Sequence, residues 1–241
     1  MKLPPAPHSW RLSPREAVAV QRRLAARVRR RPPARPPRFV AGLDAAFSPD
    51  GERCIAGVVL WDAGRRELVE AHRVERPLGF PYVPGLLSFR EAPALLAALR
   101  RLARRPDALL CDGHGLAHPR RFGIACHLGV LAGLPSVGCA KSRLVGEHAE
   151  PGPARGSRAA LRDGREVIGA VLRTRRDVRP VYVSVGHHFD LASAVALVLR
   201  CGGGRRLPEP TRLADRLVAR PATSSSSAAR RGPAPASSCF R

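Results

Sequence analysis

Residues 39–47 read Phe-Val-Ala-Gly-Leu-Asp-Ala-Ala-Phe, an apolar stretch typical of a buried β-strand and interrupted by one charge, Asp44. Aspartate is disfavoured in strands and is rarely buried without a partner. The alternative is a residue at the strand edge whose side chain points into solvent. Because both neighbours of Asp44 are apolar and an unpaired buried carboxylate is costly, we regard Asp44 as a candidate functional residue.

The segments around this strand predict a mixed sheet. Residues 54–61 and 66–74 have strand composition and follow short turns, which favours an antiparallel meander. Farther along, strand 109–112, helix 122–131 and strand 135–140 have the order of a parallel βαβ unit. The other predicted elements are strands 167–173 and 181–185, a loop over 147–164, and helices 88–104, 191–201 and 210–219. The fold class is therefore α/β, with antiparallel strands first and then parallel strands in a central sheet flanked by helices.

A second carboxylate, Glu91, lies on the apolar side of the helix predicted over 88–104. Leucines stand four, eight and eleven residues after it, on the same stripe. Ser88 is a suitable N-cap for this helix. The alternative role for Glu91 is a glutamate of the first turn that stabilises the helix dipole.

A third carboxylate, Asp112, ends a short apolar strand, and sites form at the carboxyl ends of parallel strands. The loop that follows contains Gly113, His114, Gly115, His118, Arg120 and Arg121. Its glycines allow a tight turn and a close approach to a ligand, and arginines beside a helix N-terminus suit a phosphate. The alternative is a polar turn that caps a helix.

Three carboxylates from separate segments match the needs of Mg²⁺, which takes hard oxygen ligands and commonly uses one or two carboxylates with phosphate oxygens. In phosphodiester hydrolysis such a metal activates water and stabilises the leaving oxygen. Asp215, on the last predicted helix, offers a fourth carboxylate, although alone it is typical of a solvated helix residue. Other chemistries lack their motifs, since the sequence contains no GxSxG, HExxH, P-loop or CxxC pattern.

The net charge of +23 indicates a polyanionic partner such as nucleic acid. Only two of the 42 basic residues are lysines, so a coding bias towards GC-rich codons is an alternative source of the excess. Residues 39–219 nevertheless hold 27 basic and 18 acidic residues, which favours a phosphate-bearing partner. Neither a signal peptide nor a bilayer-spanning run is evident, so we expect a soluble, cytoplasmic monomer without a membrane partner.

The two ends of the chain differ from its middle. Residues 13–16, Ser-Pro-Arg-Glu, form a capping-box helix start, and the amphipathic helix after it has a basic outer face. We divide the chain into a basic N-terminal helix with a Pro/Arg linker, 1–37, a catalytic domain, 38–220, and a tail, 221–241. The tail is rich in Ser, Ala, Pro and Arg and is expected to be disordered. Five of the six cysteines lie in apolar or small-residue runs and are expected to be buried, reduced thiols.

Longer motifs surround these residues, namely 81–85 with 87–91, 112–115 with 117–121, 138–141, and 207–212. Together, and in this order, they resemble the motifs of the endonuclease V family over roughly 38–219. The resemblance implies a ribonuclease H-like fold and a Mg²⁺-dependent DNA repair endonuclease that also accepts Mn²⁺. It implies that the partner is DNA containing deoxyinosine, or other deaminated or mismatched bases. Cleavage would fall at the second phosphodiester bond 3′ to the lesion.

The resemblance also implies roles for single residues. Asp44 and Asp112 match the metal-binding pair, and Glu91 matches the catalytic carboxylate beside them. Lys141 matches an active-site lysine, and Asp215 falls where relatives carry a further acidic or histidine side chain. The implied substrate-binding residues are Pro81, Tyr82, Gly113, His114, Gly115, His118 and Arg120.

Physical chemistry agrees with two of these roles. Tyr82 stands in a proline-rich loop, a stiff platform for stacking in the gap left by a displaced base. Lys141 is a compact charge that suits a phosphate. The alternatives are a half-buried loop tyrosine and a solvated lysine at a strand end.

Two other functions stay open. An inosine-specific endoribonuclease would keep the chemistry and change the substrate. A non-catalytic nucleic-acid-binding protein would explain the charge alone, although none of the expected carboxylates is missing. The basic N-terminal helix and the tail from Ala222 depart from the family pattern without touching the catalytic residues.

Overall fold

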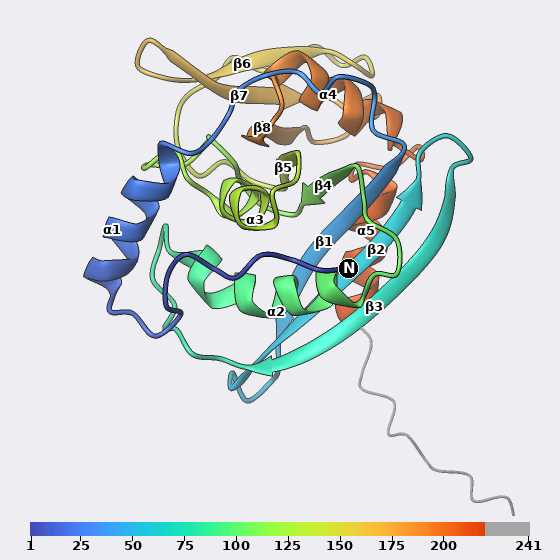
Figure 1. The fold of residues 1–241 in the computed structure, drawn as a ribbon. Helices are drawn as coiled ribbons and strands as arrows, with labels where there is room; N and C mark the ends of the chain where they lie inside the picture. The colour runs from blue at the N-terminus through green and yellow to red at the C-terminus, as the bar shows by residue number, and fades with distance from the viewer. Residues whose placement is uncertain (220–241) are drawn as a thin grey trace, which may run out of the picture.

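The protein is seen in a computed structural model that describes residues 1–219, and one eight-stranded sheet forms its centre (Figure 1). The strands are β1 (Phe39–Phe47), β2 (Arg53–Asp62), β3 (Glu67–Pro77), β4 (Ala108–Cys111), β5 (Ser136–Ala140), β6 (Arg158–Asp163), β7 (Glu166–Leu172) and β8 (Val181–His187). The helices are α1 (Pro14–Ala25), α2 (Leu87–Arg101), α3 (Ile124–Ala132), α4 (Leu191–Arg200) and α5 (Glu209–Val218). Across the sheet the strands lie in the order β3-β2-β1-β4-β5-β8-β7-β6.

Strand β1 joins the antiparallel part of the sheet to the parallel part. It pairs antiparallel with β2, which pairs antiparallel with β3, and it pairs parallel with β4. The predicted βαβ unit is β4-α3-β5, with β4 and β5 parallel. The mixed α/β sheet predicted from the sequence is therefore confirmed. Beyond β5 the sheet becomes antiparallel again through β8, β7 and β6, which the sequence alone did not indicate.

Two local predictions were wrong. Residues 158–163 belong to the predicted loop but form β6, an edge strand whose one buried residue is Leu161. Ser88 does not cap α2, because the helix begins one residue earlier and no side chain caps it. The Ser88 hydroxyl is buried and lies 3.0 Å from Nδ1 of His127 instead. The predicted disordered tail, 221–241, lies outside the described residues.

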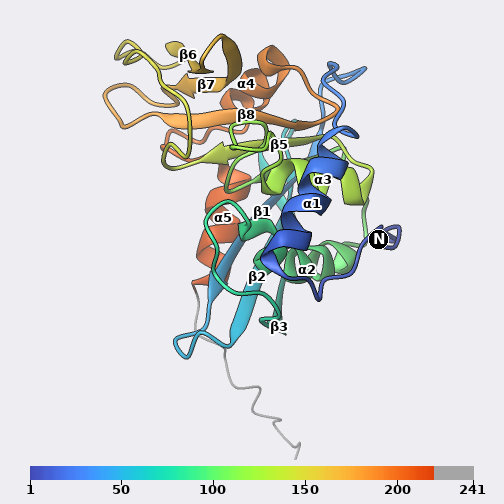
Figure 2. The same ribbon diagram turned by 90° about the vertical axis from the view of Figure 1, so that its left-hand side faces the viewer.

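Helices cover both faces of the sheet, as Figure 2 shows from the side. The α2 and α3 helices pack against one face, while α4 and α5 pack against the other. None of the helices in 1–219 combines the length and apolarity needed to cross a membrane. The five cysteines of this range are free and buried, as predicted.

The N-terminal helix packs into the main core. The predicted capping box is present, since Oγ of Ser13 accepts from the backbone of Glu16 and the Glu16 carboxylate accepts from the Ser13 N–H at 2.7 Å. The buried residues Ala17, Val20 and Leu24 join the core cluster that also contains the apolar side chains of α4 and β8. Helix α1 is therefore held against the rest of the chain by burial of apolar surface.

Candidate active site

Two glycines let α5 lie directly on the strand that carries Asp44. Side chains alternate along a strand, so Asp44 and Gly42 share a face of β1. A Cβ on Gly42 would lie 2.1 Å from the carbonyl carbon of Pro210, at the start of α5. Gly57, which is opposite Asp44 on β2, likewise leaves room for this helix. This close packing brings Asp215 of α5 to the carboxylate of Asp44.

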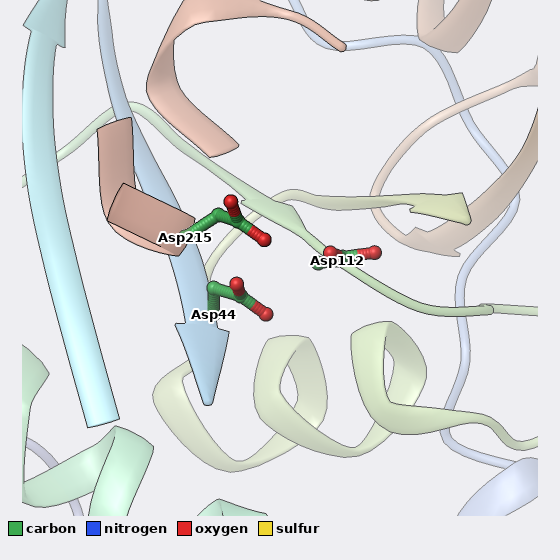
Figure 3. Close-up of side chains that lie close together, drawn as sticks. All are labelled: Asp44, Asp112 and Asp215. Carbon is green, nitrogen blue, oxygen red and sulfur yellow. The ribbon is translucent and has the colours of Figure 1, made fainter. Parts of the chain in front are cut away.

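Asp112 reaches the same place from the neighbouring parallel strand. Its backbone N–H donates to the carbonyl of Leu43 at 2.9 Å, so β1 and β4 deliver their carboxylates at the same end of the sheet. One oxygen from each of Asp44, Asp112 and Asp215 lies within 4.8 Å of the others. The three carboxylates converge from β1, the end of β4 and α5 (Figure 3). Asp215, which the sequence suggested only as a possible fourth carboxylate, therefore lies beside Asp44 and Asp112, the pair predicted to bind metal.

The clustered carboxylates resist ionisation. Burial, and then the charge of Asp112, raise the pKa of Asp44 to about 7. Burial, and then the charges of Asp44 and Asp112, raise the pKa of Glu91 to about 8. As predicted, Glu91 is on the buried face of α2, with 8% of its surface exposed. Because like charges in a partly dry site disfavour the ionised forms, this centre favours a cation.

Lys141 supplies positive charge at the end of β5. Its Nζ lies 2.7 Å from Oδ2 of Asp112 and 2.8 Å from Oδ1 of Asp215. Burial opposes the charge of Lys141, but its hydrogen bonds to the two aspartates outweigh burial and raise its pKa. The backbone at this position is held as well, since the Arg206 guanidinium donates to the carbonyl oxygen of Lys141. The ammonium group therefore offsets part of the acidic charge.

A cavity of about 320 Å³ adjoins this centre through Gly113, the residue after Asp112. Tyr82 lines it and is 70% exposed, and the neighbouring Pro81 is exposed too. His114 also lines it, with Nε2 at 3.0 Å from the Ser142 carbonyl. Within 1–219 the buried Nδ1 of His114 has no hydrogen-bond partner. The volume lies in the range of small-molecule pockets.

The two glycines of the Asp112 loop serve close packing. Gly113 has a φ of 138°, and a Cβ there would lie 2.7 Å from Cγ2 of Ile124. A Cβ on Gly115 would lie 2.0 Å from the carbonyl oxygen of Val185 on β8. Larger residues would therefore push this loop away from the sheet and from the carboxylates.

The arginines that the sequence associated with phosphate have protein partners here. Arg120 donates through Nη2 to the carbonyl of Gly85 at 2.7 Å. Arg121 forms ion pairs with Asp163 and Glu166, at 2.8 and 2.7 Å. His118, from the same loop, also contacts the Gly85 carbonyl, through Nε2 at 2.9 Å.

Gln21 was not predicted from the sequence. This residue of α1 lines the cavity, is 1% exposed, and donates through Nε2 to the carbonyls of Gly85 and Phe122 at 3.0 and 3.2 Å. A signal was present, because position 21 follows the buried Ala17 by four residues and so lies on the apolar stripe of the helix. A polar residue on such a stripe needs buried partners.

The strand order β3-β2-β1-β4-β5 and the carboxylates at the ends of the parallel strands agree with the ribonuclease H-like fold that the resemblance implied. The family model described as Endonuclease V matches residues 22–216. The chain therefore belongs to the endonuclease V family, whose members are nucleases, and this confirms the resemblance seen in the sequence.

Individual relatives agree. An endonuclease V from Geotalea uraniireducens is 54% identical over 200 residues, covering 83% of this chain and 84% of that protein. The crystal structure of the endonuclease V from Streptomyces avermitilis matches with a TM-score of 0.84 and 45% identity, covering 88% and 94% of the two chains. An endonuclease V from Ciona intestinalis, in complex with a 24mer DNA containing an inosine followed by a ribo-adenosine, matches with a TM-score of 0.74 and 25% identity. That match covers 85% of this chain and 95% of the Ciona chain.

Proposed function

We propose that this chain is a Mg²⁺-dependent endonuclease that recognises deoxyinosine in DNA and cleaves the second phosphodiester bond 3′ to it. The observation that carries the proposal is the cluster of Asp44, Asp112 and Asp215 adjoining a cavity lined by Tyr82. The inosine-containing DNA bound by the Ciona relative supports the substrate. A cytoplasmic location and a monomeric state remain predictions.

The three aspartates fit a divalent cation. Their oxygens are hard donors that lie within 4.8 Å of one another. Burial, and then the charge of Asp112, raise the pKa of Asp44, and a bound cation would offset both. Asp44 and Asp112 would hold the ion, with Asp215 as a third oxygen donor. Mn²⁺ suits the same ligands and would substitute. When bound, the ion supplies an activated water and a counter-charge for the leaving oxygen.

Glu91 and Lys141 are the other two charged residues of the site, and we assign proton transfer to Glu91 and phosphate neutralisation to Lys141. Burial, and then the charges of Asp44 and Asp112, raise the pKa of the Glu91 carboxyl beside the proposed cation site. We assign Glu91 the transfer of a proton in the reaction. Lys141 is already paired with Asp112 and Asp215, and its compact ammonium group would also neutralise a phosphate oxygen at the scissile bond.

The cavity accounts for recognition of one base. An enzyme that reads a single base in a duplex displaces that base into a pocket and fills the gap in the stack. Tyr82, exposed beside Pro81, is the residue we assign to the gap. His114, which lines the cavity, is the polar residue we assign to the displaced base.

The loop residues support this recognition indirectly. Gly113 and Gly115 allow their loop to lie against the sheet beside the pocket. His118 and Arg120 both contact the Gly85 carbonyl. We therefore assign His118 and Arg120 to shaping the substrate site.

A cleavage assay with mapped product ends tests the proposal. End-labelled duplexes with one deoxyinosine, matched undamaged duplexes and matched inosine-containing RNA are incubated with the protein and Mg²⁺. We expect a nick at the second bond 3′ to deoxyinosine, little cleavage of undamaged DNA, and none with Asp112→Asn. The ribo-adenosine in the Ciona complex makes the RNA comparison necessary. RNA cleaved as well as DNA, or better, would make the chain an endoribonuclease, and an uncut deoxyinosine duplex would reject the proposal.

A further inference from the structure

The carbonyl oxygen of Gly85 accepts three hydrogen bonds. The donors are Nε2 of Gln21 at 3.0 Å, Nε2 of His118 at 2.9 Å and Nη2 of Arg120 at 2.7 Å. Gln21 comes from α1, whereas the other two donors come from the loop after Asp112. A Cβ at position 85 would lie 2.8 Å from Nη2 of Arg120, so a side chain there would displace one of the three donors. We call these three donors the Gly85 clamp.

The clamped carbonyl belongs to a tight turn directly after Tyr82. The N–H of Leu86 donates to the carbonyl of Val83 at 2.9 Å, which closes the turn. Pro84 and Gly85 are its central residues, and Gly85 has a φ of 77°. This is the signature of a type II turn, in which proline and then glycine occupy those positions. Fixing Gly85 therefore fixes the chain three residues from the exposed aromatic ring of Tyr82.

The polar atoms of the clamp satisfy one another. Oε1 of Gln21 accepts from Nε of Arg120 at 2.5 Å, which leaves its amide nitrogen to donate to Gly85 and Phe122. Nδ1 of His118 accepts from the backbone N–H of Arg120 at 3.1 Å, so its Nε2 carries the hydrogen. Burial lowers the pKa of His118 to about 4 and keeps this neutral form. Removing one member of such a buried network leaves its partners unsatisfied, which costs more than the bond itself.

We propose that Gln21 is a positioning residue for Tyr82. Its amide joins α1 to the turn through Gly85 and to the loop after Asp112 through Phe122, so it links two segments that line the cavity. The effect on recognition rests on the proposed function, whereas the effect on the position of Tyr82 does not. Gln21 is far less exposed than Tyr82, at 1% against 70%, so it acts through the turn rather than by contact with nucleic acid.

Fluorine NMR can follow Tyr82 directly, because the chain has only two tyrosines, Tyr82 and Tyr182. Protein labelled with fluorotyrosine gives two signals, which Tyr82→Phe assigns. We expect Gln21→Leu to shift the Tyr82 signal towards that of free fluorotyrosine and to leave the Tyr182 signal unchanged. The matched control is Val20→Ala, a buried neighbour on α1 that makes no hydrogen bond to Gly85, and it should move neither signal.

Kinetics separate positioning from general damage to the fold. Gln21→Leu removes the three hydrogen bonds of the Gln21 amide, to Gly85, Phe122 and Arg120. On a deoxyinosine duplex we expect it to raise KM about tenfold or more, with kcat within about twofold of wild type. Gln21→Glu keeps the size of the side chain and the acceptor for Arg120, but it loses the N–H groups that donate to Gly85 and Phe122. It should therefore also raise KM and shift the Tyr82 signal. If Gln21→Leu does not fold, Gln21→Glu takes its place as the test. An unchanged Tyr82 signal in folded Gln21 variants would overturn the proposal. If Gln21→Leu shifts the Tyr82 signal but the wild-type protein does not cleave a deoxyinosine duplex, the positioning role of Gln21 would stand and the proposed function would be rejected.

Discussion

Replacing Gly42 by alanine would move α5, and with it one of the three aspartates. The added Cβ would lie 2.1 Å from the carbonyl carbon of Pro210 and 2.2 Å from its oxygen. Both are backbone atoms, so no side-chain rotation relieves the clash. Ordinary contact begins at 3.4 Å, so α5 must retreat by about 1.3 Å, the difference between 3.4 and 2.1 Å. Asp215 lies on this helix and would retreat from Asp44 with it.

This displacement should harm activity more than stability. Overpacking a core costs about 1–3 kcal/mol. At about 2–4 °C per kcal/mol for a chain of this size, Tm should fall by roughly 2–12 °C. Misplacing a reacting or metal-binding group by about 1 Å can slow a reaction roughly 100-fold. We therefore expect Gly42→Ala to fold at 25 °C and to retain about 1% of the wild-type cleavage rate.

A series of three alanine variants provides the assay. Gly57→Ala meets the same helix, at 2.9 Å from a Val218 methyl and 3.0 Å from the Ala214 carbonyl oxygen. These contacts are less severe than those at Gly42, so its effect should be milder. Gly79→Ala meets nothing within 4 Å and should match wild type. Tm from circular dichroism and single-turnover cleavage with Mg²⁺ are measured for each. Our reasoning is that close packing of α5 on β1 assembles the site. It would be refuted if Gly42→Ala kept the wild-type Tm and cleavage rate, or if Gly57→Ala lost more of either than Gly42→Ala.

Three further predictions follow from the site and its surroundings. In the metal-free protein the pKa of Asp44 is about 7, above its unfolded value, so the stability from its protonation is lost as pH rises through 7. The cation must displace this proton, so the Kd for Mg²⁺ measured by calorimetry should tighten about tenfold from pH 6 to pH 8, and a flat Kd would contradict the assignment. Burial, and then the charge of His8, lower the pKa of His127 to about 3, so the unfolded chain takes up the proton first and stability falls as pH drops below 6.5. The loss should reach about 2 kcal/mol at pH 5, at about 1.4 kcal/mol per pH unit, and His127→Gln should flatten this part of the urea-denaturation profile. Tyr82→Ala should leave Tm within about 1 °C because the ring is 70% exposed, yet cut deoxyinosine cleavage about tenfold, as expected for one lost base stack; equal loss with undamaged DNA would show that Tyr82 does not recognise the lesion.

The parts of the fold that could be predicted have strong local signals. The strand that carries Asp44 was predicted with its observed bounds because it is continuously apolar between turn residues. The capping box at Ser13 and Glu16 depends on residues three positions apart, which a sequence displays directly. Glu91 was correctly placed on the buried face of its helix, because the leucines at helical spacing reveal that face.

The parts that were missed depend on distant partners or on weak patterns. Ser88 looked like a cap, but its hydroxyl contacts His127, which is 39 residues away. Strand β6 is polar because it lies at the sheet edge, although Gly164, with a φ of 57°, begins a two-residue hairpin turn that could have been recognised.

The same limit applies to the site. Asp215 looked like an ordinary helix residue, and only the packing of α5 against Gly42 brings it to Asp44. Gln21 could be marked as unusual on its apolar stripe, but its partners Gly85 and Arg120 lie 64 and 99 residues away. The sequence therefore indicated which residues are chemically important, while long-range packing decided how they meet.

The proposed function depends on the cation site formed by Asp44, Asp112 and Asp215. Its most direct test is a Mg²⁺ titration by calorimetry on wild type and Asp112→Asn, with cleavage of the deoxyinosine duplex followed on the same samples. We predict that wild type binds Mg²⁺ and cuts as it saturates, while Asp112→Asn stays folded, binds Mg²⁺ at least tenfold more weakly and does not cut. Equal binding and cleavage by the two proteins would contradict the site.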